Sequence, residues 1–234
     1  MRIALCDDNN KDSAELKKIL ISNARILEKQ IEVFQSCAEL INKFQENEGY
    51  DIVFLDIDMP EMNGIELGLK IKTISSSTYI VFVTNYPQYA INAFDCAAFH
   101  YLLKPLELQK VNTVLDSLLN FYQKKNAVYS FKTKSGYVSV PIAELYFVEC
   151  FKKHLIFHMK GKVTETPGKL SDAYAFLISH GFCQVHQGFI VNMNKISSLD
   201  KFNVYLDNDE IVPISQRKRS EVLSRYAEFL GENL

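Results

Sequence analysis

Short apolar runs alternate with stretches of helical periodicity in the first half of the chain. The runs are rich in β-branched and aromatic residues, as β-strands are, and they cover residues 2–6, 31–34, 52–55, 79–83 and 99–102. Between them, apolar residues recur three or four positions apart, which is the spacing of one helix face. Strands that alternate with helices in this way predict βαβ units and a parallel sheet.

The clearest helical stretch begins at Glu107, after the last of these strands. Its apolar positions are 108, 111, 114, 115, 118, 119 and 122. Weaker stretches of the same kind lie around Leu16, Leu40 and Ile65. Five strands, each followed by a helix, within residues 1–122 predict an α/β fold of the flavodoxin-like type, a doubly wound five-stranded parallel sheet.

The pattern changes after Asn126. Short β-rich runs follow one another, separated by turn signals such as Lys160-Gly161 and Asp207-Asn208. They cover residues 128–133, 137–140, 145–149, 154–159, 163–166, 203–206 and 210–213, and helical patterns interrupt them at 170–178 and 216–230. The prediction is a first domain at 1–124, a short linker at 125–128, and a mostly β second domain with few short helices at 129–234.

The composition supports folded domains and excludes several other classes. Hydrophobic residues make up 47% of the 234 positions and charged residues 23%, a balance that excludes wholesale disorder and coiled-coil architecture. No apolar run approaches the roughly 18 to 20 residues of a membrane-spanning helix. Asp7 and Asp8 precede any hydrophobic signal region, so no export signal is expected and the predicted location is the cytoplasm.

Charge is divided unequally between the two halves. Residues 1–125 contain 13 Lys and Arg against 17 Asp and Glu, whereas residues 126–234 contain 13 against 11 and four of the five histidines. The second half could therefore meet a polyanion, although an excess this small does not establish nucleic-acid binding by itself. The five cysteines are widely spaced and lack CxxC or Cys/His ligand spacing, so buried free thiols are expected rather than disulfides or a zinc site.

Polar and ionisable residues gather where the predicted parallel strands end. Asp7 and Asp8 end the first strand, Asp56 the third and Thr84 the fourth, and Lys104 follows the fifth. Ligand chemistry in such sheets lies outside the carboxyl ends of the strands, so these side chains should share one crevice. Clustered carboxylates need a divalent metal or an ammonium group to offset their repulsion, and Mg²⁺ suits carboxylates, waters and phosphate oxygens.

The same residues resemble the receiver domain of response regulators over residues 1–122. The likeness rests on Asp7-Asp8, the run FLDIDMP at 54–60 with Asn63-Gly64 after it, Thr84, and Lys104-Pro105. It implies that Asp56 is the phosphoacceptor and that Thr84 and Lys104 bind the phosphoryl oxygens.

The receiver resemblance also implies a metal site and a switch. Asp8, Asp56 and the main-chain carbonyl of Asp58 would bind Mg²⁺, and Asp7 would support the metal through water. Pro105 would follow a cis peptide bond, and Tyr101 matches the aromatic switch position of the family. A rival interpretation is that Asp56-Ile57-Asp58 is the DxD nucleophile motif of a Mg-dependent haloacid-dehalogenase phosphohydrolase. That motif normally opens its domain, whereas here it follows the third strand.

Residues 129–230 resemble the LytTR-type DNA-binding domain. The likeness rests on the runs VPIAELYFVE at 140–149, KHL at 153–155, FCQVHQGFIVN at 182–192 and VPISQRKR at 212–219. In that family, loops between strands contact the DNA. The implied contact residues are His154, Gln187, Arg217, Lys218, Arg219, Lys152 and Lys153. Gln187 departs from the Arg, Lys or Asn common at its position, and glutamine can bond adenine bidentately, so the base preference stays open.

The two resemblances together imply a transcription regulator of a two-component system. A sensor histidine kinase would phosphorylate Asp56, and the activated protein would form a homodimer on double-stranded promoter DNA. Such a protein is a switch rather than a turnover enzyme, and it requires no membrane. The alternatives are the phosphohydrolase and a receiver whose β domain binds protein or RNA.

Overall fold

The computed structural model describes residues 1–46, 48–60, 62–89, 96–133 and 136–232, and the chain forms two compact units, Met1–Phe121 and Tyr122–Leu234. Each unit has its own sheets and its own hydrophobic cores. None of the helices among the described residues combines the length and the apolar character of a membrane span.

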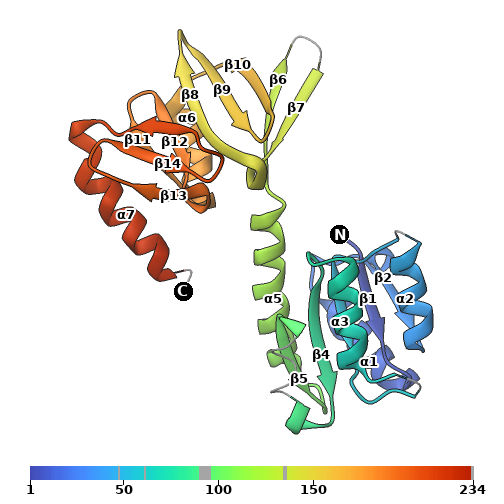
Figure 1. Cartoon of the computed structure of the whole chain (residues 1–234). Helices are drawn as coiled ribbons and strands as arrows, with labels where there is room; N and C mark the ends of the chain where they lie inside the picture. Colours follow the sequence, from blue (N-terminus) through green and yellow to red (C-terminus); the bar gives the residue numbers. More distant parts are fainter. Residues whose placement is uncertain (47, 61, 90–95, 134–135, 233–234) are drawn as a thin grey trace. The chain divides into compact units, whose positions relative to one another are not determined.

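The first unit is built on a five-stranded parallel sheet in the order β2-β1-β3-β4-β5 (Figure 1). The strands are β1 (Ile3–Cys6), β2 (Ile31–Phe34), β3 (Ile52–Leu55), β4 (Tyr79–Thr84) and β5 (His100–Leu103). The helices are α1 (Asn10–Ser22), α2 (Cys37–Gln45), α3 (Gly64–Ile74) and α5 (Leu108–Lys125). This is the doubly wound sheet that the alternating pattern predicts, so the predicted fold class is confirmed.

Successive strand residues face opposite sides of the sheet and therefore enter two cores. Ala4 and Cys6 pack with α2 and α3, whereas Ile3 and Leu5 pack with α1 and α5. Polar side chains cap the N-termini of three of the helices. Asn9, Ser36 and Asn63 accept hydrogen bonds from backbone N–H groups of α1, α2 and α3, respectively. The helix expected between β4 and β5 falls partly on residues 90–95, which lie outside the described residues.

The second unit is mostly β, as predicted, and its largest sheet has the antiparallel order β10-β9-β8-β12-β11. Two smaller sheets, β6-β7 and β13-β14-β15, complete it. The strands are β6 (Val128–Thr133), β7 (Gly136–Pro141), β8 (Leu145–Phe151), β9 (His154–Met159), β10 (Lys162–Pro167), β11 (Phe182–His186), β12 (Phe189–Asn192), β13 (Ile196–Leu199), β14 (Asn203–Leu206) and β15 (Ile211–Pro213). The helices are α6 (Leu170–Leu177) and α7 (Arg219–Glu232).

The large sheet separates two cores. One core joins β8 and β9 to α6 and to side chains of β6 and β7, and the other joins β8 and β11 to β14, β15 and α7. Strands β11, β12 and β13 were not expected from periodicity. In β11, the partly exposed Gln184 and His186 interrupt the buried apolar residues, so its short run carries no clear strand pattern.

Helix α5 ends at Lys125 and β6 begins at Val128, so the join between the helix and the first strand of the β-rich region is short. The two compact units divide between Phe121 and Tyr122, within α5. The domain limits 1–124 and 129–234 with a linker at 125–128 therefore stay a prediction. The five cysteines are free thiols, and four are buried while Cys150 is half-buried.

Candidate functional site

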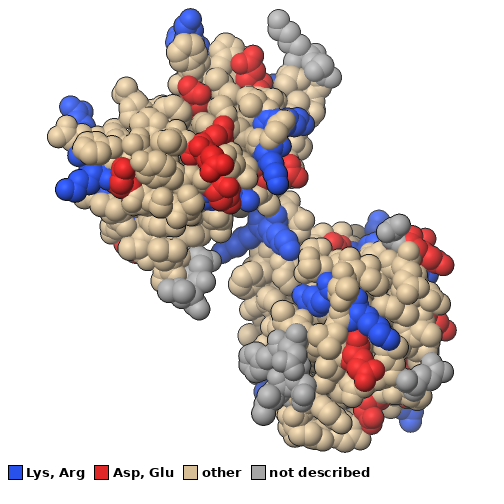
Figure 2. Space-filling model, in the orientation of Figure 1, with Lys and Arg blue, Asp and Glu red and all other residues tan. Residues whose placement is uncertain are grey.

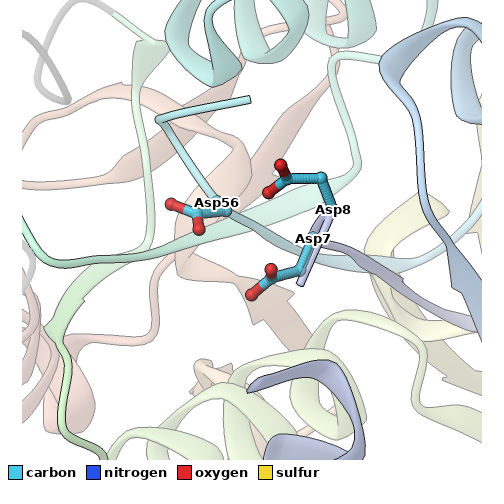
Figure 3. A group of neighbouring side chains, drawn as sticks. All are labelled: Asp7, Asp8 and Asp56. Carbon is cyan, nitrogen blue, oxygen red and sulfur yellow. The ribbon is translucent and has the colours of Figure 1, made fainter. Parts of the chain in front are cut away.

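Three carboxylates meet at the carboxyl ends of β1 and β3. Asp7 and Asp8 follow β1 directly, and Asp56 follows β3. One carboxylate oxygen from each residue lies within 4.8 Å of the other two, and Figure 3 shows the three side chains pointing to the same side. Asp7 and Asp56 are only 7% and 5% exposed, whereas Asp8 is exposed. Carboxylates this close repel one another unless a cation lies among them.

The ammonium of Lys104 supplies positive charge to this cluster. Its Nζ lies 2.8 Å from Oδ2 of Asp7, 2.7 Å from Oδ2 of Asp56 and 2.6 Å from Oδ2 of Asp12. The lysine follows β5, its side chain is 8% exposed, and the Lys104–Pro105 peptide bond is cis. The structure thus brings Asp7, Asp8, Asp56 and Lys104 together at one edge of the sheet.

Burial and charge act in opposite directions on these groups. Burial raises the pKa of Asp7, and the hydrogen bond and positive charge of Lys104 lower it again without cancelling the increase. For Lys104, burial lowers the pKa, but the hydrogen bonds to Asp12, Asp56 and Asp7 more than offset this, so its pKa lies above the ordinary value. Lys104 therefore remains a cation at neutral pH.

The backbone around Asp56 fixes the orientation of its carboxylate. Oδ1 accepts a hydrogen bond from the backbone N–H of Ile57 at 2.6 Å, and Oδ2 accepts one from the Lys104 ammonium. The Gly64 backbone N–H donates to the carbonyl of Ile57 at 2.9 Å, and a Cβ on Gly64 would lie only 2.0 Å from the Asp56 carbonyl oxygen. Glycine is required at this close approach of two backbones, which explains the Asn63-Gly64 pair in the sequence.

Thr84 ends β4 beside the cluster. Its side chain is completely buried, and its Oγ1 has no hydrogen-bond partner among the described residues. A buried hydroxyl without a partner costs about 1–3 kcal/mol, so an incoming ligand oxygen would stabilise it. The Thr84 carbonyl accepts a hydrogen bond from the backbone N–H of Lys104 at 2.8 Å. This bond links the two residues that are expected to bind phosphoryl oxygens.

Two tyrosines connect the loop after β4 to its surroundings. The Tyr101 hydroxyl donates to the backbone carbonyl of Tyr86, and Tyr101 lies opposite Phe82 in the pairing of β5 with β4. The Tyr86 hydroxyl is hydrogen-bonded to the exposed carboxylate of Asp58, which raises the pKa of Tyr86. The side chain of Asp58 thus has a partner within the chain, separate from the expected role of its carbonyl.

Asp12 is a member of this site that sequence reasoning missed. It lies in the first turn of α1, four residues after Asp8, and its side chain is 29% exposed. An acidic residue in the first turn of a helix is commonly explained by the helix dipole, so its position alone does not indicate a contact with Lys104.

The expected DNA contacts lie on turns of the second unit or on the first residue of the element that follows a turn. Lys152 and Lys153 form the turn between β8 and β9 with positive φ angles of 47° and 65°, and both lysines and His154 are exposed. Exposed cations on this turn can reach an external anion. His154 Nδ1 lies 3.3 Å from the Lys152 carbonyl.

Two further turns lie beside this one. Gln187 is exposed in the turn between β11 and β12, and the adjoining Gly188 carbonyl accepts from the Cys150 backbone N–H at 2.8 Å, close to the end of β8. On the other side, the Ser215 backbone N–H donates to the Val185 carbonyl at 3.0 Å, immediately before the short 3₁₀ turn Gln216–Lys218. The three turns therefore occupy the same end of the second unit.

The three cations at the start of α7 differ in their surroundings. Arg217 is exposed. Lys218 forms an ion pair with Glu221 at 3.2 Å, and the Arg219 guanidinium lies 4.5 Å from the centre of the Phe202 ring. Two of the three cations thus have partners inside the chain.

Basic side chains form no single continuous surface on the visible face of this unit. In Figure 2, Lys and Arg stand toward its margins and Asp and Glu lie between them, among the residues drawn in colour.

Comparison with known proteins gives the class of each unit. Residues 3–116 match the response regulator receiver domain, and residues 135–226 match the LytTr DNA-binding domain. A response regulatory protein of Yersinia pestis is 30% identical over the whole chain and 98% of its own length. The sensory transduction protein LytT of Enterococcus faecalis is 26% identical over 92% of the chain and 95% of its own length.

A third relative is the transcriptional regulatory protein YpdB of Escherichia coli, 26% identical over 76% of the chain and 81% of its own length. The chain therefore belongs to the response regulators in which a receiver domain precedes a LytTr DNA-binding domain. Both family predictions are confirmed. This architecture is that of a phosphorylation-dependent DNA-binding regulator, and it does not favour the phosphohydrolase.

Proposed function

We propose that this protein is a transcription regulator switched by phosphorylation of Asp56. A sensor histidine kinase donates the phosphoryl group, and the phosphorylated protein dimerises and binds double-stranded promoter DNA. The observation that carries this proposal is the setting of Asp56: its buried carboxylate lies 2.7 Å from the Lys104 ammonium, and β4 beside it ends in the unpartnered hydroxyl of Thr84.

The acidic cluster fits a magnesium ion. Mg²⁺ is usually bound by one or two carboxylates together with waters and phosphate oxygens, and Asp8, Asp56 and the Asp58 carbonyl would supply the protein ligands. Asp7 would support the ion through water. Bound Mg²⁺ supplies the positive charge that offsets the repulsion between the carboxylates and a dianionic phosphodonor.

Phosphoryl transfer forms one bond and breaks another. A carboxylate oxygen of Asp56 attacks the phosphorus atom, and the bond to the leaving group breaks with its electron pair. Lys104 then exchanges its contact with Asp56 for a phosphoryl oxygen, to which its compact charge is suited. The Thr84 hydroxyl donates to a second phosphoryl oxygen and thereby gains a hydrogen-bond partner.

The output of the switch would pass through the loop after β4. A Thr84 hydroxyl drawn toward the phosphoryl group shifts this loop, whose Tyr86 carbonyl accepts from Tyr101. Tyr101 would then reposition on β5 and change the neighbouring surface, which we propose as the dimer interface.

In the dimer, the second units of the two copies would bind the DNA through their turns. We propose that His154, Gln187 and Arg217 reach the base edges or the nearest phosphates. Lys152, Lys153, Lys218 and Arg219 would contact phosphates, with Lys218 and Arg219 exchanging their present partners Glu221 and Phe202.

Labelling with a small phosphodonor tests the first step. Incubation with acetyl phosphate and Mg²⁺ should add one phosphoryl group to the intact protein, as mass spectrometry would show. Asp56→Asn and a chelator should each abolish the addition. Undiminished labelling of Asp56→Asn would contradict the assignment, and steady consumption of the donor without a protein-bound group would indicate a phosphohydrolase instead.

A further inference from the structure

Asp12 has no part in the phosphoacceptor and metal roles proposed above, yet it makes the shortest of the three carboxylate contacts to Lys104, at 2.6 Å. It comes from α1, whereas Asp7 and Asp56 follow strands of the sheet. Lys104 is therefore contacted by a residue of helix α1 as well as by two residues that follow strands of the sheet.

Lys104 is shared among three carboxylates. Its Nζ donates hydrogen bonds to Asp7 and Asp56, and it forms an ion pair with Asp12 at 2.6 Å. When a phosphoryl oxygen replaces the Asp56 contact, the Asp12 carboxylate still neutralises part of the ammonium charge. Asp12 thus competes electrostatically with the phosphoryl group for the lysine.

The surroundings of Asp12 distinguish it from the other two partners. Its side chain is 29% exposed, against 9% for Asp7 and 6% for Asp56. It lies on the wall of an open cavity of about 220 Å³. The other lining residues are Glu15, Asn85, Lys104, Pro105 and Leu106. Asp12 can therefore be replaced with little effect on the buried core.

We propose that Asp12 is a positioning residue that restrains Lys104 and raises the donor concentration needed to phosphorylate Asp56. This inference rests on the proposed function of Asp56. Removing the Asp12 charge leaves more of the Lys104 charge available to a phosphoryl oxygen and takes one negative charge away from the neighbourhood of a dianionic donor. Both effects strengthen donor binding without changing the attacking carboxylate.

Phosphorylation rates measured against acetyl phosphate concentration, at saturating Mg²⁺, test this inference. Asp12→Asn should lower the concentration that gives the half-maximal rate by about two- to fivefold, as expected for a partly exposed ion pair. The maximal rate should stay near that of the wild type. The difference should shrink as salt is added, because salt screens a partly exposed charge.

Three variants provide the comparison. Asp12→Glu keeps the charge and should behave like the wild type, whereas Asp12→Ala should match or exceed the effect of Asp12→Asn. Glu15→Gln removes an exposed charge one turn further along α1, on the same cavity wall, and should have a much smaller effect. Circular dichroism would establish that each variant is folded.

The outcomes separate this inference from the proposed function. If the wild type is labelled at Asp56 but Asp12→Asn has an unchanged or higher half-maximal concentration, Asp12 does not compete for Lys104 and the inference is overturned. A lower maximal rate in Asp12→Asn would also overturn it, because Asp12 would then assist the transfer. If the wild type itself is not labelled at Asp56, the proposed function fails together with this inference.

Discussion

Gly64 shows how a single position controls the orientation of the proposed phosphoacceptor. A Cβ here would lie 2.0 Å from the Asp56 carbonyl oxygen and 2.8 Å from the Ile57 Cα, and both neighbours are backbone atoms that cannot rotate away. Gly64→Ala should therefore destabilise the first unit by about 1–3 kcal/mol, the usual effect of overpacking. It should also slow acetyl phosphate labelling of Asp56. Urea denaturation and intact-mass labelling would measure the two effects.

Gly49→Ala is the matched control for this change. A Cβ at Gly49 would meet only the Phe44 ring, at 3.4 Å, which is an ordinary contact. The control should leave labelling unchanged and alter stability far less. Equal effects of the two substitutions would show that the close approach at Gly64 is not what positions Asp56.

The elements that were predictable from the sequence are those with strong periodicity. The strands of the first sheet carry apolar residues toward two cores, and the rule of carboxyl strand ends correctly brought Asp7, Asp56 and Lys104 together. The contact of Asp12 depends on where the tertiary fold places α1 relative to Lys104, which no local pattern encodes. Strand β11 was missed because Gln184 and His186 interrupt its apolar run.

The turns at one end of the second unit should differ in what they contribute to DNA binding. Arg217→Ala should cost about 1–3 kcal/mol of binding free energy if the guanidinium reads a base. Lys153→Ala should instead weaken binding to all sequences and lower the salt slope by about one unit for the lost phosphate contact. Gel shifts at several salt concentrations, with a selected site and a random duplex, would distinguish the two.

Lys160 offers a control at the opposite end of β9. It is exposed in the turn between β9 and β10, whereas Lys153 and His154 lie at the start of β9. Lys160→Ala should leave affinity and salt slope unchanged. A loss of binding in Lys160→Ala equal to that in Lys153→Ala would place the DNA surface elsewhere.

The turn between β13 and β14 depends on the charge of Asp200. Its Oδ1 accepts hydrogen bonds from the backbone N–H groups of Phe202 at 2.6 Å and Asn203 at 2.8 Å, which lowers the pKa of Asp200. A lowered pKa gives stability that is present above the pKa of the unfolded chain and is lost as the pH falls through the folded value. Asp200→Asn should therefore be less stable than the wild type at pH 7, and the two should converge below about pH 4. Thermal unfolding across this range would test the prediction, and a pH-independent difference would contradict it.

At the scale of the whole molecule, we expect phosphorylation to drive self-association. Tyr101 and the loop after β4 connect Thr84 to the surface around β5, so a ligand on Asp56 should change that surface. Sedimentation with beryllofluoride, a phosphate mimic, and Mg²⁺ should convert monomer to dimer. Tyr101→Ala should weaken the conversion. A protein that stays monomeric across the micromolar range with the mimic bound would contradict this expectation.

The central claim is that the phosphorylation state of Asp56 controls DNA binding, and genome-wide mapping of bound DNA in cells tests it most directly. The wild type, Asp56→Asn and Arg217→Ala would be compared at equal protein levels. The account predicts a defined set of sites for the wild type and loss of occupancy in both variants, although Arg217→Ala should still be phosphorylated. Occupancy of the same sites by Asp56→Asn at the level of the wild type would contradict the account.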